Sequence, residues 1–167
     1  VAEAQRLGMV LDVSHLNEPG FYEVASLAAK PFIASHSNCR ELCSSPRNLT
    51  DMQIAKLAGA GGVMGMNAYS AFSSDVESER SAEKLLEHID RIIELYGAGH
   101  VGLGLDLCDC ITALRIDHAL LQNGDLFSDH ADAKERFFNL IREKYPDDIS
   151  DKIFGENFMR VLEEVIG

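Results

Sequence analysis

The sequence predicts an α/β fold built on parallel (β/α) repeats, and two observations support this prediction. Short apolar runs recur along the chain, and each ends in polar residues: Gly8–Ser14, Pro31–His36, Gly61–Asn67 and His100–Asp106. Near-continuous apolar runs of this length are typical of strands buried on both faces, as in parallel sheets. Segments with helical spacing separate the runs, and such alternation favours parallel strands joined by right-handed crossovers.

Helices are expected where apolar residues recur with helical spacing and capping residues flank them. The expected positions are Pro19 to Ala29, Thr50 to the glycines at 59–62, Ser81 to Gly97, and the regions near 131–144 and 150–165. Thr50 and Ser81 are typical first residues of helices, and Pro19 suits a first turn. The last two helices follow the strands and form a C-terminal helical part. The first residues, Val1 to Arg6, resemble the end of a helix.

Length and charge limit the possible functions. The chain has 167 residues, of which 46% are hydrophobic and 25% charged, so we expect residues 1–167 to form a single domain. The net charge of −12 makes a nucleic acid or an anionic membrane surface an unexpected partner. No apolar window is long enough to span a membrane, and the first residues lack the apolar region of a signal peptide. A cytoplasmic location is therefore expected.

The cysteines form two local pairs, Cys39 with Cys43 and Cys108 with Cys110. Their C-x₃-C and C-x-C spacings match common zinc motifs poorly. Structural or incidental thiols are favoured, with zinc binding and disulfides as the alternatives.

Two histidines follow consecutive predicted strands, His15 in DVSH and His36 in ASHS. Loops at the carboxyl ends of parallel strands build the active sites of α/β folds, and neighbouring strands lie about 4.8 Å apart. Two imidazoles at such positions can share one metal ion. A single histidine at a strand end is more often a partly buried, hydrogen-bonded residue than a metal ligand.

Three further polar residues lie near these strand ends. Asp106 ends the fourth run and is a candidate ligand or general acid/base, with a loop-ordering role as the alternative. Arg47 suits bidentate binding of a carboxylate, or it pairs with Asp51 or another acidic residue on the surface. Asp12 either orients a histidine ring or bonds local backbone amides. His88 is expected on a solvated helix face, and His100 begins a strand, away from the chemistry.

The motifs taken together resemble the membrane dipeptidase (renal dipeptidase) family of amidohydrolase-type metallopeptidases. The resemblance rests on LGMVLDVSH, PFIASHSNCRELCSSPRNLTD, GGVMGMN, HVGLGLD and GENFMRVLEEV, in this order along nearly the whole chain. It implies a (β/α)₈ TIM-like barrel with two zinc ions, which hydrolyses the peptide bond of dipeptides. It also implies that His15 and His36 bind the second zinc, that Arg47 holds the substrate carboxylate and that Asp106 handles a proton.

The chain departs from the family pattern before His15 and after Asp106. The H-x-D motif that holds the first metal in the family has no counterpart, and DLCDC replaces the usual D-F-D-G. A barrel typically takes about 250 residues. We therefore expect the C-terminal half of a dipeptidase, with at most a partial zinc site and little activity alone. Partners would be a dipeptide substrate and either a second copy or an N-terminal half. The alternative is a non-catalytic α/β binding or assembly module.

Overall fold

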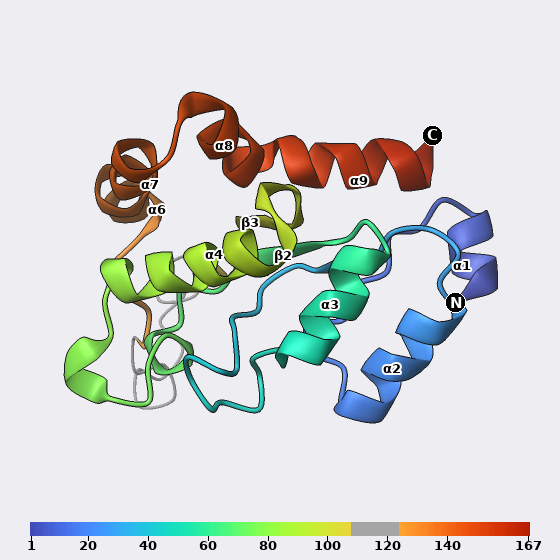
Figure 1. Cartoon of the computed structure of the whole chain (residues 1–167), viewed down its shortest axis with the longest axis horizontal. Coiled ribbons are helices and arrows are strands. Elements are labelled where there is room, and N and C mark those ends of the chain that lie inside the picture. The colour runs from blue at the N-terminus through green and yellow to red at the C-terminus, as the bar shows by residue number, and fades with distance from the viewer. Residues whose placement is uncertain (108–123) are drawn as a thin grey trace, which may run out of the picture.

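The computed structural model describes residues 1–107 and 124–167, and a three-stranded parallel sheet lies at its centre (Figure 1). The strands are β1 (Ile33–Ala34), β2 (Val63–Met66) and β3 (Val101–Leu103), in the order β1-β2-β3. Ala34 pairs with Met64, and Gly65 pairs with Gly102. The predicted α/β class with parallel strands is confirmed.

The expected strand at Gly8–Ser14 is reduced to one bridge, so this part of the prediction was wrong. Asp12 forms an isolated parallel bridge with Ile33, and the Val13 N–H donates to the Ile33 carbonyl over 2.9 Å. Just beyond the end of β1, the Ser35 N–H donates to Asp12 Oδ1 over 2.9 Å. The ladder stops because an aspartate side chain accepts the hydrogen bond that a backbone carbonyl would otherwise accept.

Helices surround the sheet, and short 3₁₀ turns and π-helical turns connect them. The helices are α1 (Ala2–Arg6), α2 (Glu18–Leu27), α3 (Asp51–Gly59), α4 (Ala82–Tyr96), α6 (His130–Ala133), α7 (Asn139–Lys144), α8 (Asp147–Asp151) and α9 (Asn157–Ile166). The 3₁₀ turns are Ser70–Phe72, Glu77–Glu79 and Ala98–His100, and the π-helical turns are Lys134–Phe138 and Lys152–Glu156. In the part of the chain that the structure describes, no helix is long and apolar enough to cross a membrane.

Capping residues explain where the helices begin. The Thr50 hydroxyl accepts from the Gln53 N–H, and the Gln53 side chain accepts from the Thr50 N–H, which together form a capping box. Ser81 caps α4 in the predicted place. Asn17 caps α2, two residues before Pro19, so this helix begins slightly earlier than expected.

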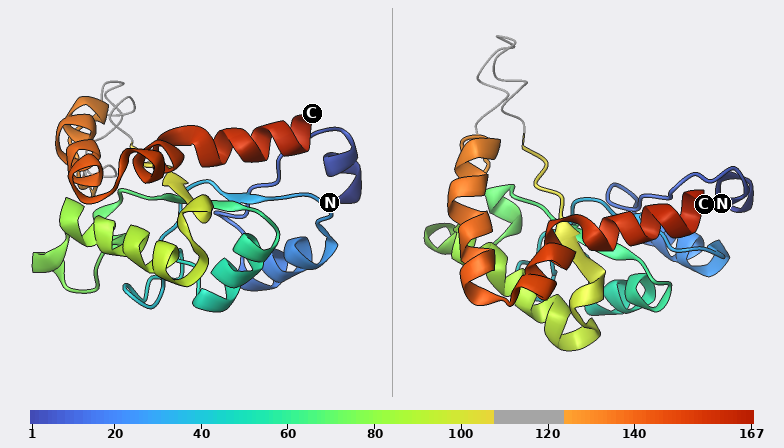
Figure 2. Two further views of the ribbon diagram at one scale, coloured as in Figure 1. Left: turned by 45° about the horizontal axis from the view of Figure 1, so that its top comes forward. Right: turned by 90° about the horizontal axis from the view of Figure 1, so that it is seen from above.

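Helices cover both faces of the sheet (Figure 2). On one face, Met64 and Met66 are buried in the main core with residues of α3 and α4. On the other face, Val63 packs with Val161 and Val165 of α9. Successive residues of β2 thus point to opposite sides, as the strand period requires. The near-continuous apolar composition of the strand follows from this double burial.

Candidate active site

The four residues singled out from the sequence lie together at the carboxyl end of the sheet. His15 Nε2 is 2.8 Å from His36 Nε2, and the ring centroids are 4.8 Å apart. Asp106 Oδ2 lies 3.9 Å from His36 Nε2, and Arg47 Nη2 lies 3.4 Å from His15 Nε2. Segments from four places in the sequence therefore meet in one cluster of side chains. Their chemical roles stay predictions.

Two glycines allow the strand ends to approach each other closely. A Cβ atom on Gly104 would lie 1.7 Å from the Ser35 carbonyl oxygen, and one on Gly65 would lie 2.1 Å from the same atom. No larger residue fits either position without moving backbone. The glycine-rich runs of the sequence thus bring His36 and Asp106 near one another.

His36 is held by the two serines that flank it in space. Its backbone N–H donates to Ser14 Oγ over 2.9 Å, and its Nδ1 lies 2.7 Å from Ser35 Oγ. Burial lowers the pKa of His36, against the opposing effect of Asp106. The ring is therefore neutral near pH 7, and neutral imidazole is the form that binds metal ions.

Asp12 bonds backbone amides and also reaches His36 through a serine. Its Oδ1 accepts from the N–H groups of Ser14 and Ser35, and its Oδ2 accepts from the Ser35 hydroxyl over 2.5 Å. Burial alone would raise the pKa of Asp12, but these hydrogen bonds outweigh burial, and the pKa lies below its usual value. Both alternatives considered for Asp12 are thus partly realised.

Asp106 adopts a left-handed backbone conformation, with φ of 57°, and its side chain is half-exposed. Its Oδ2 accepts from Asn67 Nδ2 over 3.3 Å. Asn67 is itself fixed by the buried Asn38, whose Oδ1 accepts from the Asn67 N–H. Sequence reasoning missed Asn67, although it ends the third apolar run just as His36 and Asp106 end theirs.

Arg47 points at the histidine pair and not at Asp51. Its Nη1 donates to the Ser14 carbonyl, and its guanidinium lies 5.9 Å from the centre of the Phe72 ring. Asp51 pairs instead with Arg91. Arg47 also lines a cavity of about 250 Å³ next to the cluster. The surface-pair alternative with Asp51 is therefore wrong.

The expectation of a solvated His88 is wrong, because the side chain is fully buried. His88 Nδ1 accepts from the Cys39 N–H over 3.0 Å, and Nε2 donates to the Ser73 carbonyl over 2.9 Å. Burial lowers the pKa of His88 to about 4. The sequence held a signal, since His88 lies three residues after Leu85 and four before Ile92, both of which are buried.

The remaining candidates fall outside the cluster. Cys39 and Cys43 are free thiols, both buried, which excludes a disulfide between them. His100 lies just before β3 and contacts the Gly62 carbonyl, at the opposite end of the strand from Asp106. Cys108, Cys110 and His118 lie outside the described residues.

The cluster fits a metal ion in ligand type and offers part of a coordination sphere. The Nε2 atoms of His15 and His36 converge, and imidazole nitrogen is a preferred ligand of zinc. Structural and catalytic zinc sites use three or four protein ligands. Within residues 1–107 and 124–167, no three His, Cys, Asp or Glu side chains lie close enough together to hold one ion. His15 and His36 are thus two candidate ligands.

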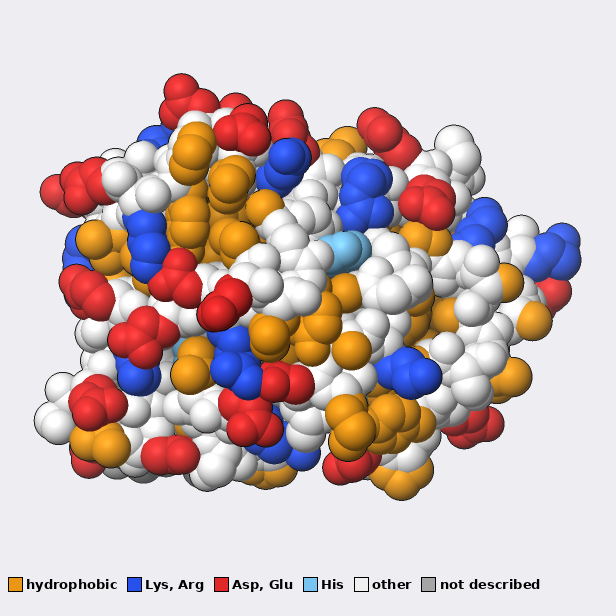
Figure 3. All heavy atoms as spheres, in the orientation of Figure 1, with side chains coloured by type: hydrophobic (Ala, Val, Ile, Leu, Met, Phe, Trp, Pro, Cys, Tyr) orange, Lys and Arg blue, Asp and Glu red, His pale blue; other side chains and the backbone are white. Residues whose placement is uncertain are grey.

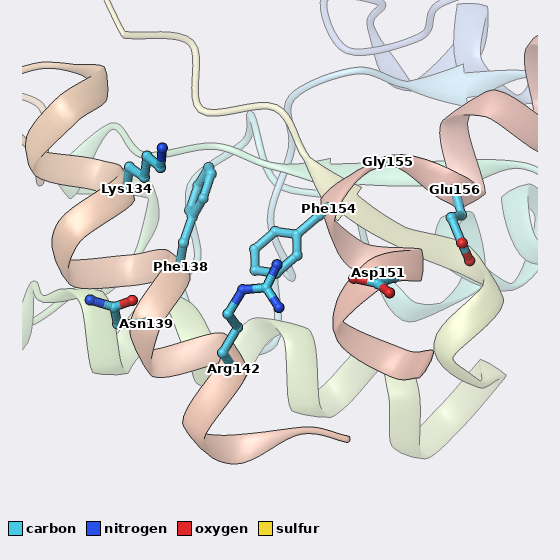
Figure 4. A pocket seen from close by; sticks show the side chains of 8 residues that line it. All are labelled: Lys134, Phe138, Asn139, Arg142, Asp151, Phe154, Gly155 and Glu156. Carbon is cyan, nitrogen blue, oxygen red and sulfur yellow. The ribbon is translucent and has the colours of Figure 1, made fainter. Parts of the chain in front are cut away.

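A second hollow lies away from the strand ends. A groove of about 550 Å³ runs between α7 and the π-helical turn at Lys152–Glu156 (Figure 4). The rings of Phe138 and Phe154 line it with their centroids 5.1 Å apart and their planes tilted by 41°, and the Arg142 guanidinium lies over Phe154. Figure 3 shows hydrophobic side chains gathered in this region, with charged side chains around them.

Comparisons with known proteins show which family this chain is similar to. The family model of membrane dipeptidases (peptidase family M19) matches residues 1–166. An uncharacterized protein in the pqqA 5' region of Klebsiella pneumoniae is 36% identical over 169 residues, which cover 99% of this chain and 58% of that protein.

Solved structures show the same similarity. The dipeptidase AC, a family M19 metallopeptidase, is 34% identical with a TM-score of 0.81, and the match covers 100% of this chain and 47% of that one. A metallopeptidase from Rhodobacter sphaeroides, liganded with a phosphinate mimic of the dipeptide L-Ala-D-Ala, is 33% identical with a TM-score of 0.78, over 98% of this chain and 44% of that one. The chain thus spans about half the length of the relatives it matches. With a family match along almost its whole length, the chain belongs to the membrane dipeptidase family, peptidase family M19.

Proposed function

We propose that this chain contributes the histidine, arginine and aspartate side chains of a zinc-dependent dipeptidase. The observation that carries the proposal is the contact series from Asp106 through His36 and His15 to Arg47. Two metal-binding groups, a cation and a carboxylate meet where α/β enzymes place their active sites. The solved relative liganded with a dipeptide mimic supports a dipeptide as the substrate.

In this proposal, His15 and His36 would hold one zinc ion through their Nε2 atoms. When bound, zinc polarises the peptide carbonyl and lowers the pKa of the attacking water. The contacts of Ser35 and Ser14 with His36 keep its ring aimed at the position of the ion. The orientation of a ligand strongly affects metal affinity, so the contacts of Ser14 and Ser35 with His36 are part of the proposed zinc site.

Arg47 binds the C-terminal carboxylate of the dipeptide. A guanidinium has five N–H donors, and Arg47 Nη1 donates to the Ser14 carbonyl. Other N–H groups of Arg47 can therefore bind the carboxylate. The guanidinium lies 5.9 Å from the centre of the Phe72 ring, within reach of a cation–π interaction, and its planar shape suits paired hydrogen bonds to a carboxylate. The adjacent cavity of about 250 Å³ leaves room for movement of the arginine side chain.

Asp106 accepts and returns a proton during hydrolysis. Its carboxylate is half-exposed, lies 3.9 Å from the histidine that binds zinc, and is oriented by Asn67. A general base acts on the attacking water from hydrogen-bond distance, and a half-exposed carboxylate beside the proposed zinc ligands supports this role. The left-handed backbone at Asp106 turns the chain sharply at the strand end and helps to place the carboxylate there.

Metal content tests the proposal directly. We expect purified chain, loaded with zinc and desalted, to retain the ion by elemental mass spectrometry, and His36→Ala to lose it. The matched control is His100→Gln, which alters a histidine at the other end of the sheet and should retain zinc. Equal zinc in all three proteins would contradict the proposed role of His36. No zinc in the parent would contradict the proposal as a whole and favour a binding module without metal.

We also propose that the chain alone turns over dipeptides slowly or not at all. Its described residues supply two zinc ligands, and its relatives are about twice as long. Hydrolysis of L-Ala-D-Ala by the purified chain is the measurement. Turnover on the order of 10 per second that a chelator abolishes would contradict this expectation.

A further inference from the structure

A chain of hydrogen bonds runs from Asp12 through Ser35 to the back of the His36 ring. The Ser35 Oγ atom lies 2.5 Å from Asp12 Oδ2 and 2.7 Å from His36 Nδ1. The opposite ring nitrogen, Nε2, points at His15. A neutral imidazole carries one proton, on either Nδ1 or Nε2. When Nδ1 holds this proton, Nε2 has a lone pair that can bind a metal ion.

The number of available protons decides the direction of these hydrogen bonds. An ionised carboxylate only accepts, so the contact between Asp12 and Ser35 needs the single hydroxyl proton of Ser35. Ser35 Oγ then has no proton left for His36 and can only accept from it. The remaining neighbour, Ser14 Oγ, is 3.4 Å away and does not change this count.

We propose that Asp12 and Ser35 are positioning residues that hold the ring proton of His36 on Nδ1, so that Nε2 presents its lone pair to a divalent cation. The role in metal binding rests on the proposed function, whereas the position of the ring proton follows from the hydrogen bonds of the metal-free chain. Metal-binding histidines commonly donate their other N–H to a carboxylate or carbonyl. Here the carboxylate acts through a serine hydroxyl.

The same geometry predicts that Asp12→Asn reverses the arrangement. The oxygen at the Oδ1 position accepts two backbone N–H groups, so it must stay an oxygen in the variant. The amide NH₂ is then placed opposite Ser35 Oγ and donates to it. Ser35 is released to donate its proton to His36 Nδ1, and the ring proton moves to Nε2, where it competes with metal binding.

Long-range ¹H–¹⁵N correlation spectra of the metal-free, histidine-labelled chain measure the proton position, at a pH above the ordinary histidine pKa of about 6.5. We expect His36 to carry its proton on Nδ1 in the parent chain. Ser35→Ala should lose this preference, and Asp12→Asn should invert it. Ser37→Ala is the matched control, because Ser37 Oγ on the other side of His36 is buried and has no hydrogen-bond partner among the described residues.

Zinc affinity, measured by competition with a chromophoric chelator, is the second readout. Ser35→Ala and Asp12→Asn should weaken it about 10- to 100-fold, and Ser37→Ala should leave it unchanged. A parent chain with the His36 proton on Nε2, or a proton position that Ser35→Ala does not alter, would overturn the inference. If the proton position behaves as expected and the parent binds no zinc, the proposed function fails while the hydrogen-bond arrangement stands. Should Asp12→Asn not fold, Ser35→Ala decides the question.

Discussion

At the residue scale, buried polar side chains fix the loops that carry the site. His88 joins the backbone of Cys39, in the loop after β1, to the backbone of Ser73, in the loop after β2. Each ring nitrogen has one partner, so the ring is neutral, with its proton on Nε2. The loop after β1 leads from His36 to Arg47, and its position depends on this buried ring.

Because His88 is neutral in the folded chain, its protonation opposes folding. Burial lowers its pKa from 6.5 to about 4, so the unfolded chain binds the proton first as the pH falls. The stability contribution is complete above pH 6.5 and is lost between pH 6.5 and about 4, on the order of 3 kcal/mol in total. Urea unfolding of the parent and of His88→Gln across this range measures it. The difference between the two proteins should shrink as the pH falls, and a constant difference would contradict the expectation.

At the element scale, the spacing of the strand ends depends on glycine. The Ser35 carbonyl lies against Gly65 of β2 and against Gly104, just after β3. These contacts hold the three strand ends at the separation that lets His36 approach Asp106. Side chains here would separate the strands and disperse the cluster.

Gly104→Ala is therefore expected to destabilise the fold by about 1–3 kcal/mol, because the new methyl group collides with backbone and not with a flexible side chain. It should also weaken zinc binding, since Ser35 and His36 must move. Gly59→Ala in α3 is the matched control. A Cβ there meets nothing within 4 Å, and alanine favours a helix by about 0.5–1 kcal/mol. Thermal unfolding of both variants gives the comparison, and equal melting temperatures would refute the steric argument.

At the scale of the whole molecule, the last helix closes the second face of the sheet. Apolar side chains of α9 pack on residues of the sheet that lie much earlier in the sequence. The α9 residues are Phe158, Val161 and Val165, and they form one cluster with Val63 of β2. Asn157 Nδ2 donates to the carbonyls of Ala98 and Val101, which anchors the helix at the amino end of β3. The sheet is thus buried on both faces only when the C-terminal residues dock.

Val161→Ala should cost about 2 kcal/mol of unfolding free energy, because it leaves a small cavity between α9 and the sheet. Leu162→Ala, one residue away on the exposed side of the same helix, should change stability by about 0.5 kcal/mol or less. Chemical denaturation of the two variants tests whether α9 is part of one cooperative core. Similar effects from both would mean that the helix is not tightly docked.

The sequence by itself determined the order of the elements after the first expected strand, the parallel class of the sheet, the family, and the residue types at the strand ends. Each of these depends on local features: apolar period, capping residues such as Thr50 and Ser81, and motifs contiguous in the chain. Only the tertiary structure decided that His15, His36, Arg47 and Asp106 meet in one contact series. It also decided that the expected strand at Gly8–Ser14 is limited to one bridge at Asp12, that Asp12 reaches His36 through Ser35, and that His88 is buried. These outcomes depend on which distant donors and acceptors are brought together on folding, and local sequence does not encode that competition.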